Sequence, residues 1–280
     1  MATGSKETIS IDLKLPKKWE DLNNPLTFGK KKTRFSFCSH STADLADKEL
    51  RYVFALLAQG FTATEVKTYC LHRWAGLKVL HRYGNLWACK HDGLKFVLAA
   101  EQVERATHAL DWLDSVPTLP VRLAKIGSHH AIDAQFQGVP FETFIVCDNL
   151  YQGYLATKSD DLLDELAAHL YGTSRIKLDE AERVSVFYWF ASLKTFFAKV
   201  FKHFFQPIVN ASDANGNMFE QEQSQFETLQ NAVNAQIRAL TKGDITKEKE
   251  VLSLDTWRAL TELDAQAREY EEMNRKYPSK

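Results

Sequence analysis

The sequence has little glycine and no excess of charge of either sign. Its 280 residues include only 12 glycines, and this scarcity argues against a phosphate-cradling loop and against a turn-rich all-β fold. The 35 lysines and arginines are balanced by 36 aspartates and glutamates, which leaves a net charge of −1. Proteins that bind nucleic acid by neutralising phosphates normally carry a basic excess, so we do not expect nucleic acid as a partner.

Cysteine is also scarce, and no segment is apolar for long enough to cross a membrane. The four cysteines include no C-x-x-C pair, which favours free thiols in a reducing compartment. The uncharged run in the most apolar segment, Val184 to Leu193, is about half of the roughly 20 residues that a bilayer needs. The N-terminus is polar, without the apolar core of a signal peptide. We therefore expect a cytoplasmic protein without a membrane span.

Familiar catalytic motifs are missing as well. The sequence contains no Walker A loop, no G-x-G-x-x-G, no H-E-x-x-H and no G-x-S-x-G, which are the patterns that hold phosphates, dinucleotides, zinc or an activated serine. We expect no enzymatic activity and no cofactor.

What the sequence does have is an aromatic segment, Ala181 to Phe205, with nine aromatic residues. Asp179 precedes it as a candidate N-cap, and Pro207 follows it as a stop signal. Spacings of three and four residues, typical of one helical face, relate its apolar members: Val186, Phe190, Leu193, Phe197, Phe201 and Phe204. The polar members are predicted on the opposite side: Ser185, Ser192, Thr195, Lys199 and Lys202. We interpret the segment as a central core helix; a membrane-surface helix, a partner groove and an oligomer interface are the alternatives.

The remaining chain predicts a mainly α protein with a small antiparallel β meander, an α+β fold. Gly84-Asn85 and Asp92-Gly93 are turn signals between the short apolar runs of Leu77 to Ala100. The expected parts are an extended N-terminal arm (1–36), an α+β domain (37–173), the aromatic core helix (174–206), a linker (207–218) and a C-terminal helical hairpin (219–280).

Apolar periodicity predicts the other helices. The first two, joined at Gly60, could also form a DNA-reading helix-turn-helix, for which the second helix offers Lys67, His72 and Arg73. A half-buried strand is expected over Val121 to Ile126, with Ala131 to Gln137 as its partner. The predicted helices are Thr42–Gln59, a helix capped by Thr62 or Thr64 that ends at Gly76, Glu101–Asp114, Phe141–Leu155, Asp160–Tyr171, Phe219–Thr241, and Thr246 to about Arg275.

A Cys-x-His pattern occurs three times, and thiolate and imidazole are both zinc ligands. Residues i and i+2 point to different sides of a helix but share a face of a strand. This excludes Cys70 and His72 as a chelating pair. The candidates that remain are Cys38, His40, Cys89 and His91, for which buried thiols and surface histidines are the default interpretation.

Two other groups of titratable residues have ordinary explanations. His129-His130 could supply a general base, but a solvent-exposed turn is the expected setting. The acidic run Asp160, Asp161, Asp164 and Glu165 could suggest a metal site, but it is expected on the polar face of an amphipathic helix.

The candidate partner-binding residues lie near the two ends of the chain. Trp19 and Leu22 follow a Pro-restricted turn and form a small apolar anchor on the predicted arm. The last predicted helix carries a narrow apolar stripe that includes Trp257, Leu260 and Tyr270, too narrow to form a core alone. We therefore expect protein partners or a homo-oligomer.

The segments LPKKWEDL (Leu15–Leu22) and DKELRYV (Asp47–Val53) resemble those of uncharacterised phage and prophage proteins. The stretch NAQIRALTKGD (Asn234–Asp244), continuing through Trp257 to Glu272, is similar in the same way. The resemblance implies a tail, neck or assembly-associated protein, a non-enzymatic role and a place in the virion. The competing hypothesis is a metal-containing enzyme or nucleic-acid-binding factor that uses the Cys/His pairs.

Overall fold

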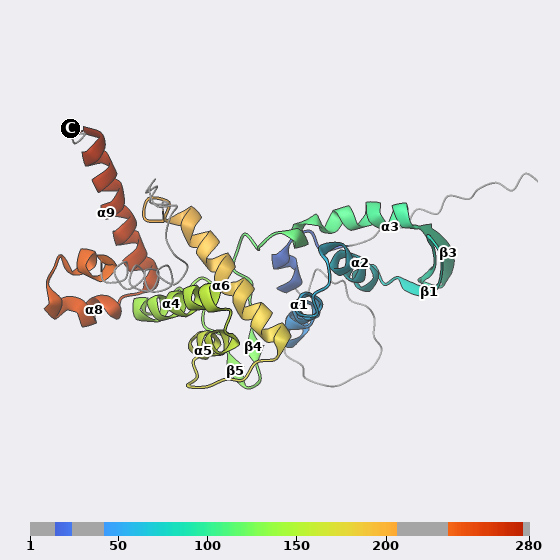
Figure 1. Cartoon of the computed structure of the whole chain (residues 1–280), viewed down its shortest axis with the longest axis horizontal. Helices are drawn as coiled ribbons and strands as arrows, with labels where there is room; N and C mark the ends of the chain where they lie inside the picture. The colour runs from blue at the N-terminus through green and yellow to red at the C-terminus, as the bar shows by residue number, and fades with distance from the viewer. Residues whose placement is uncertain (1–14, 24–41, 206–234, 277–280) are drawn as a thin grey trace, which may run out of the picture. The chain divides into compact units, whose positions relative to one another are not determined.

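The computed structural model describes residues 15–23, 42–205 and 235–276 (Figure 1). The chain divides into two compact units, Met1–Ser115 and Val116–Lys280, called here the first and the second unit. The division falls inside the segment 37–173 that the sequence predicts as one domain. The predicted fold class is confirmed, because the structure is mostly helical with one three-stranded antiparallel sheet and a large buried aromatic cluster across helices.

In the first unit, helices precede and follow the sheet, which Figure 1 shows beside α2 and α3. In chain order its elements are the 3-10 helix η1 (Trp19–Asn23), α1 (Thr42–Ala58), α2 (Ala63–Trp74), β1 (Lys78–Tyr83), β2 (Leu86–His91), β3 (Leu94–Ala99), α3 (Ala100–Thr107) and the 3-10 helix η2 (His108–Asp114).

Helix α2 shows how local signals set the boundaries. The Thr62 hydroxyl accepts from the Glu65 backbone N–H, and the Glu65 carboxylate accepts from the Thr62 backbone N–H at 2.9 Å. This capping box satisfies two donors that a helix start otherwise leaves without partners. Gly60, at φ +75°, makes the turn from α1 into α2, in the left-handed region that glycine adopts at low cost.

The predicted meander is confirmed, with strand order β1-β2-β3. Its two turns are the predicted ones: Gly84 has φ +56°, and Asp92 and Gly93 have φ +46° and +90°. A bulge between Val79 and His81 shifts the β1 register against β2, which bends and twists that strand locally.

The predicted helix Glu101–Asp114 does not continue as a single α-helix. It is α-helical in α3 and then winds into the tighter η2, inside which Leu110 has non-helical angles of φ −113° and ψ 15°. The carbonyl oxygens of Trp112 and Ser115 both accept a hydrogen bond from the Trp19 indole N–H, at 3.1 and 2.9 Å. The chain after α3 therefore serves as a docking site for η1.

The second unit is built from helices. Its elements are the short strands β4 (Lys125–Ile126) and β5 (His129–His130), α4 (Phe141–Thr157), α5 (Asp160–Leu170), α6 (Glu180–Val200), the 3-10 helix η3 (Ile245–Lys247), α8 (Glu248–Leu252) and α9 (Thr256–Lys276). Residues 235–241 are also helical.

Helix α6 is the predicted aromatic helix, and the structure confirms it as a core helix, but the helix ends at Val200 and not at Phe205 as predicted. A capping box links Asp179 and Glu182, with hydrogen bonds of 2.8 and 3.1 Å. The Phe190 ring lies 6.3 Å from Phe144 and 5.2 Å from Tyr151 between centroids, distances at which aromatic rings attract one another. The prediction of a polar opposite side is wrong in part: Ser185 and Ser192 are buried, because α6 is covered on more than one side.

Two further predictions for the second unit are wrong. Val121–Ile126 forms a strand only at Lys125–Ile126, and its partner there is His129–His130. The predicted partner Ala131–Gln137 forms no strand, although the Ala131 backbone N–H donates to the Ala124 carbonyl at 3.1 Å. The Asp133 carboxylate accepts from the backbone N–H groups of Gln135 and Gln137, at 2.9 and 3.0 Å. These bonds curl the chain into a turn, as aspartate side chains commonly do.

The predicted last helix, Thr246 to Arg275, is broken between α8 and α9. Asp255 causes the break: its Oδ1 accepts from the backbone N–H groups of Trp257 and Arg258, and its Oδ2 accepts from that of Gly138. Such an aspartate starts a new helix, and here it also ties α9 to the turn before α4.

Several predictions fall outside the described residues. They are most of the N-terminal arm 1–36, the linker 207–218 and most of the predicted helix Phe219–Thr241, so the C-terminal hairpin stays a prediction. In the part of the chain that is described, every helix is too short or too polar to cross a bilayer.

Candidate protein-contact surface

Five of the six large apolar residues that are exposed in the described part of the first unit lie on the β1-β2-β3 sheet: Val79, Tyr83, Leu86, Leu94 and Val97. Neighbouring side chains along a strand point to opposite faces, and residues paired between antiparallel strands share a face. The register therefore sorts the strands into two faces. We call one the outer face; it consists of Lys78, His81, Tyr83, Leu86, Ala88, Lys90, Lys95, Val97 and Ala99.

The outer face is open to solvent. Tyr83 is 66% exposed, Val97 57% and Leu86 48%, and seven of its nine residues are exposed, while Ala88 and Ala99 are half-buried. Single exposed apolar residues are ordinary on protein surfaces, but several on one flat sheet face mark an interaction site or an aggregation hazard.

Three lysines form a row across this face. Lys90 pairs with Lys78 on β1 and with Lys95 on β3, so the three side chains project from neighbouring strands that lie about 4.8 Å apart. Like charges placed directly opposite one another destabilise a sheet. None of the nine outer-face residues is acidic, and Asp92 in the adjoining turn lies 3.5 Å from the His91 ring. Within the described residues, no ion pair offsets the row.

The other face of the sheet is only partly covered by its own unit, since Leu94 is 54% and Val79 is 37% exposed on it. Cys89 is fully buried, and the His72 ring of α2 lies edge-on to Trp87 at 5.1 Å. His72 thus lies beside the strand that carries Cys89 and His91, whereas the charged neighbours of Cys70 are Glu49 and Arg73. Nevertheless, the described residues contain no group of three or more histidine, cysteine or acidic side chains placed to hold a metal ion. Cys38 and His40 lie outside them.

Burial also makes the described thiols poor nucleophiles. It raises the pKa of Cys70 to about 12, with the Glu49 carboxylate adding to the effect. Burial likewise raises the pKa of Cys89 and that of Cys147. The thiolate is the reactive form of cysteine, so these three residues behave as small core residues near neutral pH.

His72 should make the first unit sensitive to acid. Burial lowers the pKa of its ring below the ordinary 6.5, and its Nε2 is buried without a hydrogen-bond partner in the described structure. The unfolded chain therefore takes up this proton at a higher pH than the folded chain. We expect the His72 contribution to stability to be complete above about pH 6.5 and to decline as the pH falls below it.

Urea unfolding at pH 7.5 and at pH 5.5 measures this effect. The His72→Gln variant should lose less stability between the two pH values than the wild type, whereas His81→Gln on the outer face should behave like the wild type. Equal losses in the wild type and His72→Gln would contradict the prediction.

The helix-turn-helix interpretation of α1 and α2 depends on basic side chains of α2, and two of them, Lys67 and Arg73, form ion pairs within the unit. Lys67 forms ion pairs of 2.8 Å with both Asp111 and Asp114. Arg73 forms a two-pronged ion pair with Glu49, at 2.6 and 3.0 Å. These cations are already neutralised, so α2 offers little for phosphate groups.

The predicted arm anchors lie inside the first unit. Trp19 is 3% exposed and Leu22 is fully buried, and Trp19 stacks on Phe54 at 6.0 Å and meets Trp112 edge-on at 5.5 Å. Both side chains thus have an internal role. A partner could reach them only if residues 15–23 came away from α1 and η2.

The predicted anchors near the C-terminus differ in how far they are exposed. Leu260 is fully buried, and Trp257 is half-buried, with its indole N–H donating to the Gln135 carbonyl at 2.7 Å. Tyr270, on the distal half of α9, is 64% exposed, and Met273 beside it is 57% exposed. Of the predicted partner-binding residues, Tyr270 is the one that lies on the surface.

The remaining titratable candidates have structural roles. Arg183 on α6 holds Asp164 at 2.8 Å and Asp160 at 3.5 Å, so the acidic run fastens α5 to α6. His129 and His130 form β5, where they pair with Ile126 and Lys125.

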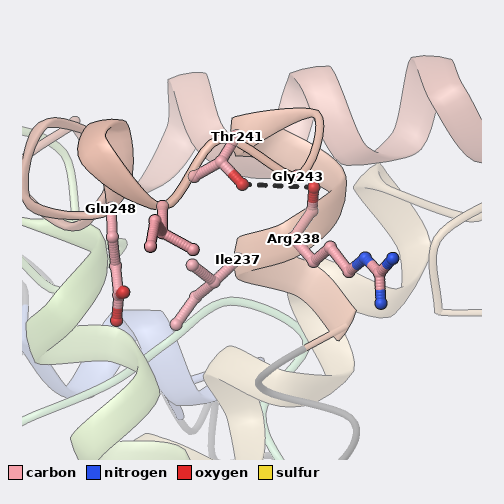
Figure 2. Close-up of a pocket in the computed structure, with 6 residues that line it drawn as sticks. Ile237, Arg238, Thr241, Gly243 and Glu248 are labelled. Atoms are coloured by element: carbon pink, nitrogen blue, oxygen red, sulfur yellow. Dashed lines mark hydrogen bonds between the residues drawn. The ribbon is translucent and has the colours of Figure 1, made fainter.

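A pocket of about 290 Å³ opens in the second unit, between the end of the 235–241 helix and α8. Figure 2 shows Ile237, Thr241 and Glu248 around it, while the Arg238 side chain points away. The Thr241 hydroxyl donates a hydrogen bond to the Arg238 carbonyl at 3.3 Å. In a small-molecule site the polar groups converge on one point. Those of this pocket do not.

The outer face is the feature that the sequence did not reveal. Lys78, Lys90 and Lys95 are separated by 12 and 5 residues and form no run, so their alignment depends on the strand register. The available signal was the absence of acidic residues from alternate positions of the meander.

Comparison with models of known families, with curated proteins and with solved structures gives no match to this chain.

Proposed function

We propose that this chain is a non-enzymatic assembly protein that acts through protein–protein contacts, and that the outer face of its sheet is one contact surface. The observation that carries the proposal is the exposure of Tyr83, Leu86 and Val97 together on one face. Covering such side chains removes apolar area from water, which contributes roughly 25 cal/mol per Å² before the costs of association.

A structural role fits the way in which the rest of the first unit is used. Trp19 and Leu22 of the predicted arm are buried within the unit, and Lys67 and Arg73 of α2 form ion pairs within it. The outer face is not engaged in this way. The setting in a phage tail, neck or assembly intermediate is the finer part of the proposal, and the resemblance of the two ends of the chain supports it.

Site-specific photo-crosslinking tests the proposal. The photoreactive amino acid p-benzoyl-phenylalanine replaces Val97 in the full chain, which is produced in the cells from which its gene derives. We expect a covalent adduct of discrete mass after illumination, since an aromatic side chain at this position would lie inside the contact.

The same substitution at Lys249, exposed on α8, is the matched control and should give no such adduct. Repeating the illumination with purified protein distinguishes a second copy of the chain from a different partner. If position 97 gives no discrete adduct in cells or in the purified protein, the outer face is not a contact surface and the proposal fails.

A further inference from the structure

We infer that the outer face binds an acidic amphipathic helix of a partner protein, with the carboxylates over the lysine row and the apolar side chains over Leu86 and Val97. This inference rests on the proposed function and specifies the chemistry of the partner.

The charge of the meander carries the first step. Residues 78–97 contain four lysines or arginines against one aspartate, a net charge of +3, in a chain whose total is −1. Three of these four cations lie in the row Lys78-Lys90-Lys95, side by side on one face. Because the row repels itself in the free protein, an anionic partner both gains attraction and relieves that repulsion.

The spacing of the row carries the second step. Neighbouring lysines of the row project from strands that lie about 4.8 Å apart. Carboxylates at positions i and i+3 or i+4 of a helix stand about 5–6 Å apart, whereas side chains on one face of a strand are nearly 7 Å apart along its length. A helix that crosses the three strands above the row therefore matches its spacing better than an extended peptide does.

The apolar residues carry the third step. Val97 lies two residues along β3 from Lys95, about 7 Å, and Leu86 lies four residues along β2 from Lys90, about 14 Å. An acidic stripe over the row thus places the adjoining stripe of the same helix over Val97, with Leu86 beyond it. The partner must therefore be amphipathic, with leucine-like side chains next to its acids.

Nucleic acid is the other polyanion that could cover the row, and the outer face fits it less well. Proteins that bind single strands stack the bases on several aromatic side chains. The outer face offers Tyr83, which lies 6.0 Å from the His81 ring, and its other apolar side chains are aliphatic. Aliphatic side chains beside lysines suit a protein surface.

Binding of designed probes to the full chain tests the inference. The first probe is a fluorescent 21-residue helical peptide with leucine at heptad positions a and d and glutamate at b, e and g. The b and e glutamates follow one another at three and four residues, the spacing that the lysine row requires, and those at e and g keep the peptide from pairing with itself. The second replaces the glutamates with lysines, and the third is a 20-nucleotide oligo-dT. Fluorescence anisotropy should show binding of the glutamate peptide, weaker binding at high salt because salt screens exposed charges, and no comparable binding of the other two.

The central variant is Lys90→Glu, which should fold because a glutamate between Lys78 and Lys95 makes favourable cross-strand pairs. We expect it to weaken binding of the glutamate peptide about tenfold or more. Val97→Thr should also weaken binding, through lost apolar contact. Lys48→Glu, which changes an exposed lysine of α1, is the matched control and should bind within about twofold of the wild type.

Lys90→Glu binding as tightly as the wild type would overturn the inference, and so would tighter binding of the oligo-dT or the lysine peptide. The crosslinking experiment at position 97 distinguishes failure of this inference from failure of the proposed function. A discrete adduct combined with indifference to Lys90→Glu leaves the contact surface in place and removes its acidic partner, whereas loss of the adduct removes both.

Discussion

Replacing Phe190 with alanine should lower the free energy of unfolding of the second unit by about 3–5 kcal/mol, the range for large aromatic side chains removed from a packed core. Phe190 is fully buried in α6, and its ring contacts Phe136, Phe144 and Tyr151 at centroid distances of 5.2 to 6.3 Å. Its removal leaves a cavity between elements that come from three different parts of the second unit. Those elements cannot all move to fill it, because each is held by other buried side chains.

Hydrogen exchange of peptides from α4 and α6, combined with urea unfolding of the full chain, measures the effect. Val200→Ala is the control on the same helix; Val200 is 41% exposed, and the loss should stay within about 0.5 kcal/mol. If Phe190→Ala and Val200→Ala cost the same, α6 is not the core of its unit.

Replacing Trp19 with alanine should destabilise the first unit by a similar amount, about 3–5 kcal/mol. The substitution removes a buried indole that stacks on Phe54 and meets Trp112 edge-on. Trp19→Phe preserves most of the apolar contact but leaves the carbonyls of Trp112 and Ser115 without the indole donor. Losing a partner in a buried hydrogen bond costs about 1–3 kcal/mol, so this variant should lie between the wild type and Trp19→Ala.

Urea unfolding of the three proteins gives this ranking, and hydrogen exchange in α1 and η2 assigns the loss to the first unit. Lys18→Ala, at the exposed neighbouring position, should leave stability nearly unchanged. A Trp19→Ala variant as stable as Lys18→Ala would show that residues 15–23 contribute nothing to the core, and would return Trp19 to the role of an anchor for a partner.

The features that the sequence predicted correctly depend on residues close together in the chain. Helix α6 follows from apolar spacing and from Asp179 as its N-cap. The meander follows from two turn signals between short apolar runs. In each case the physical cause, a cap, a turn or a stripe, lies within one or two turns of the backbone.

The features that it did not predict depend on distant contacts. The Asp255 side chain starts α9 and also accepts from Gly138, 117 residues earlier, and only the first of these roles has a local signal. The burial of Trp19 depends on carbonyls 93 and 96 residues later. The lysine row depends on the pairing of three strands, which a single sequence does not fix to within one residue.

The hydrogen bond between Trp19 and the Ser115 carbonyl has a consequence for synthesis of the protein on the ribosome. The indole donor is made early, but its two acceptors emerge only after nearly a hundred further residues have been translated. A nascent chain that stops before Trp112 therefore offers Trp19 the Phe54 ring but neither the Trp112 ring nor a hydrogen-bond acceptor for the indole N–H. Long-range closure of this kind is slow compared with local helix formation, so the site that holds Trp19 stays incomplete until the first 115 of the 280 residues have been made.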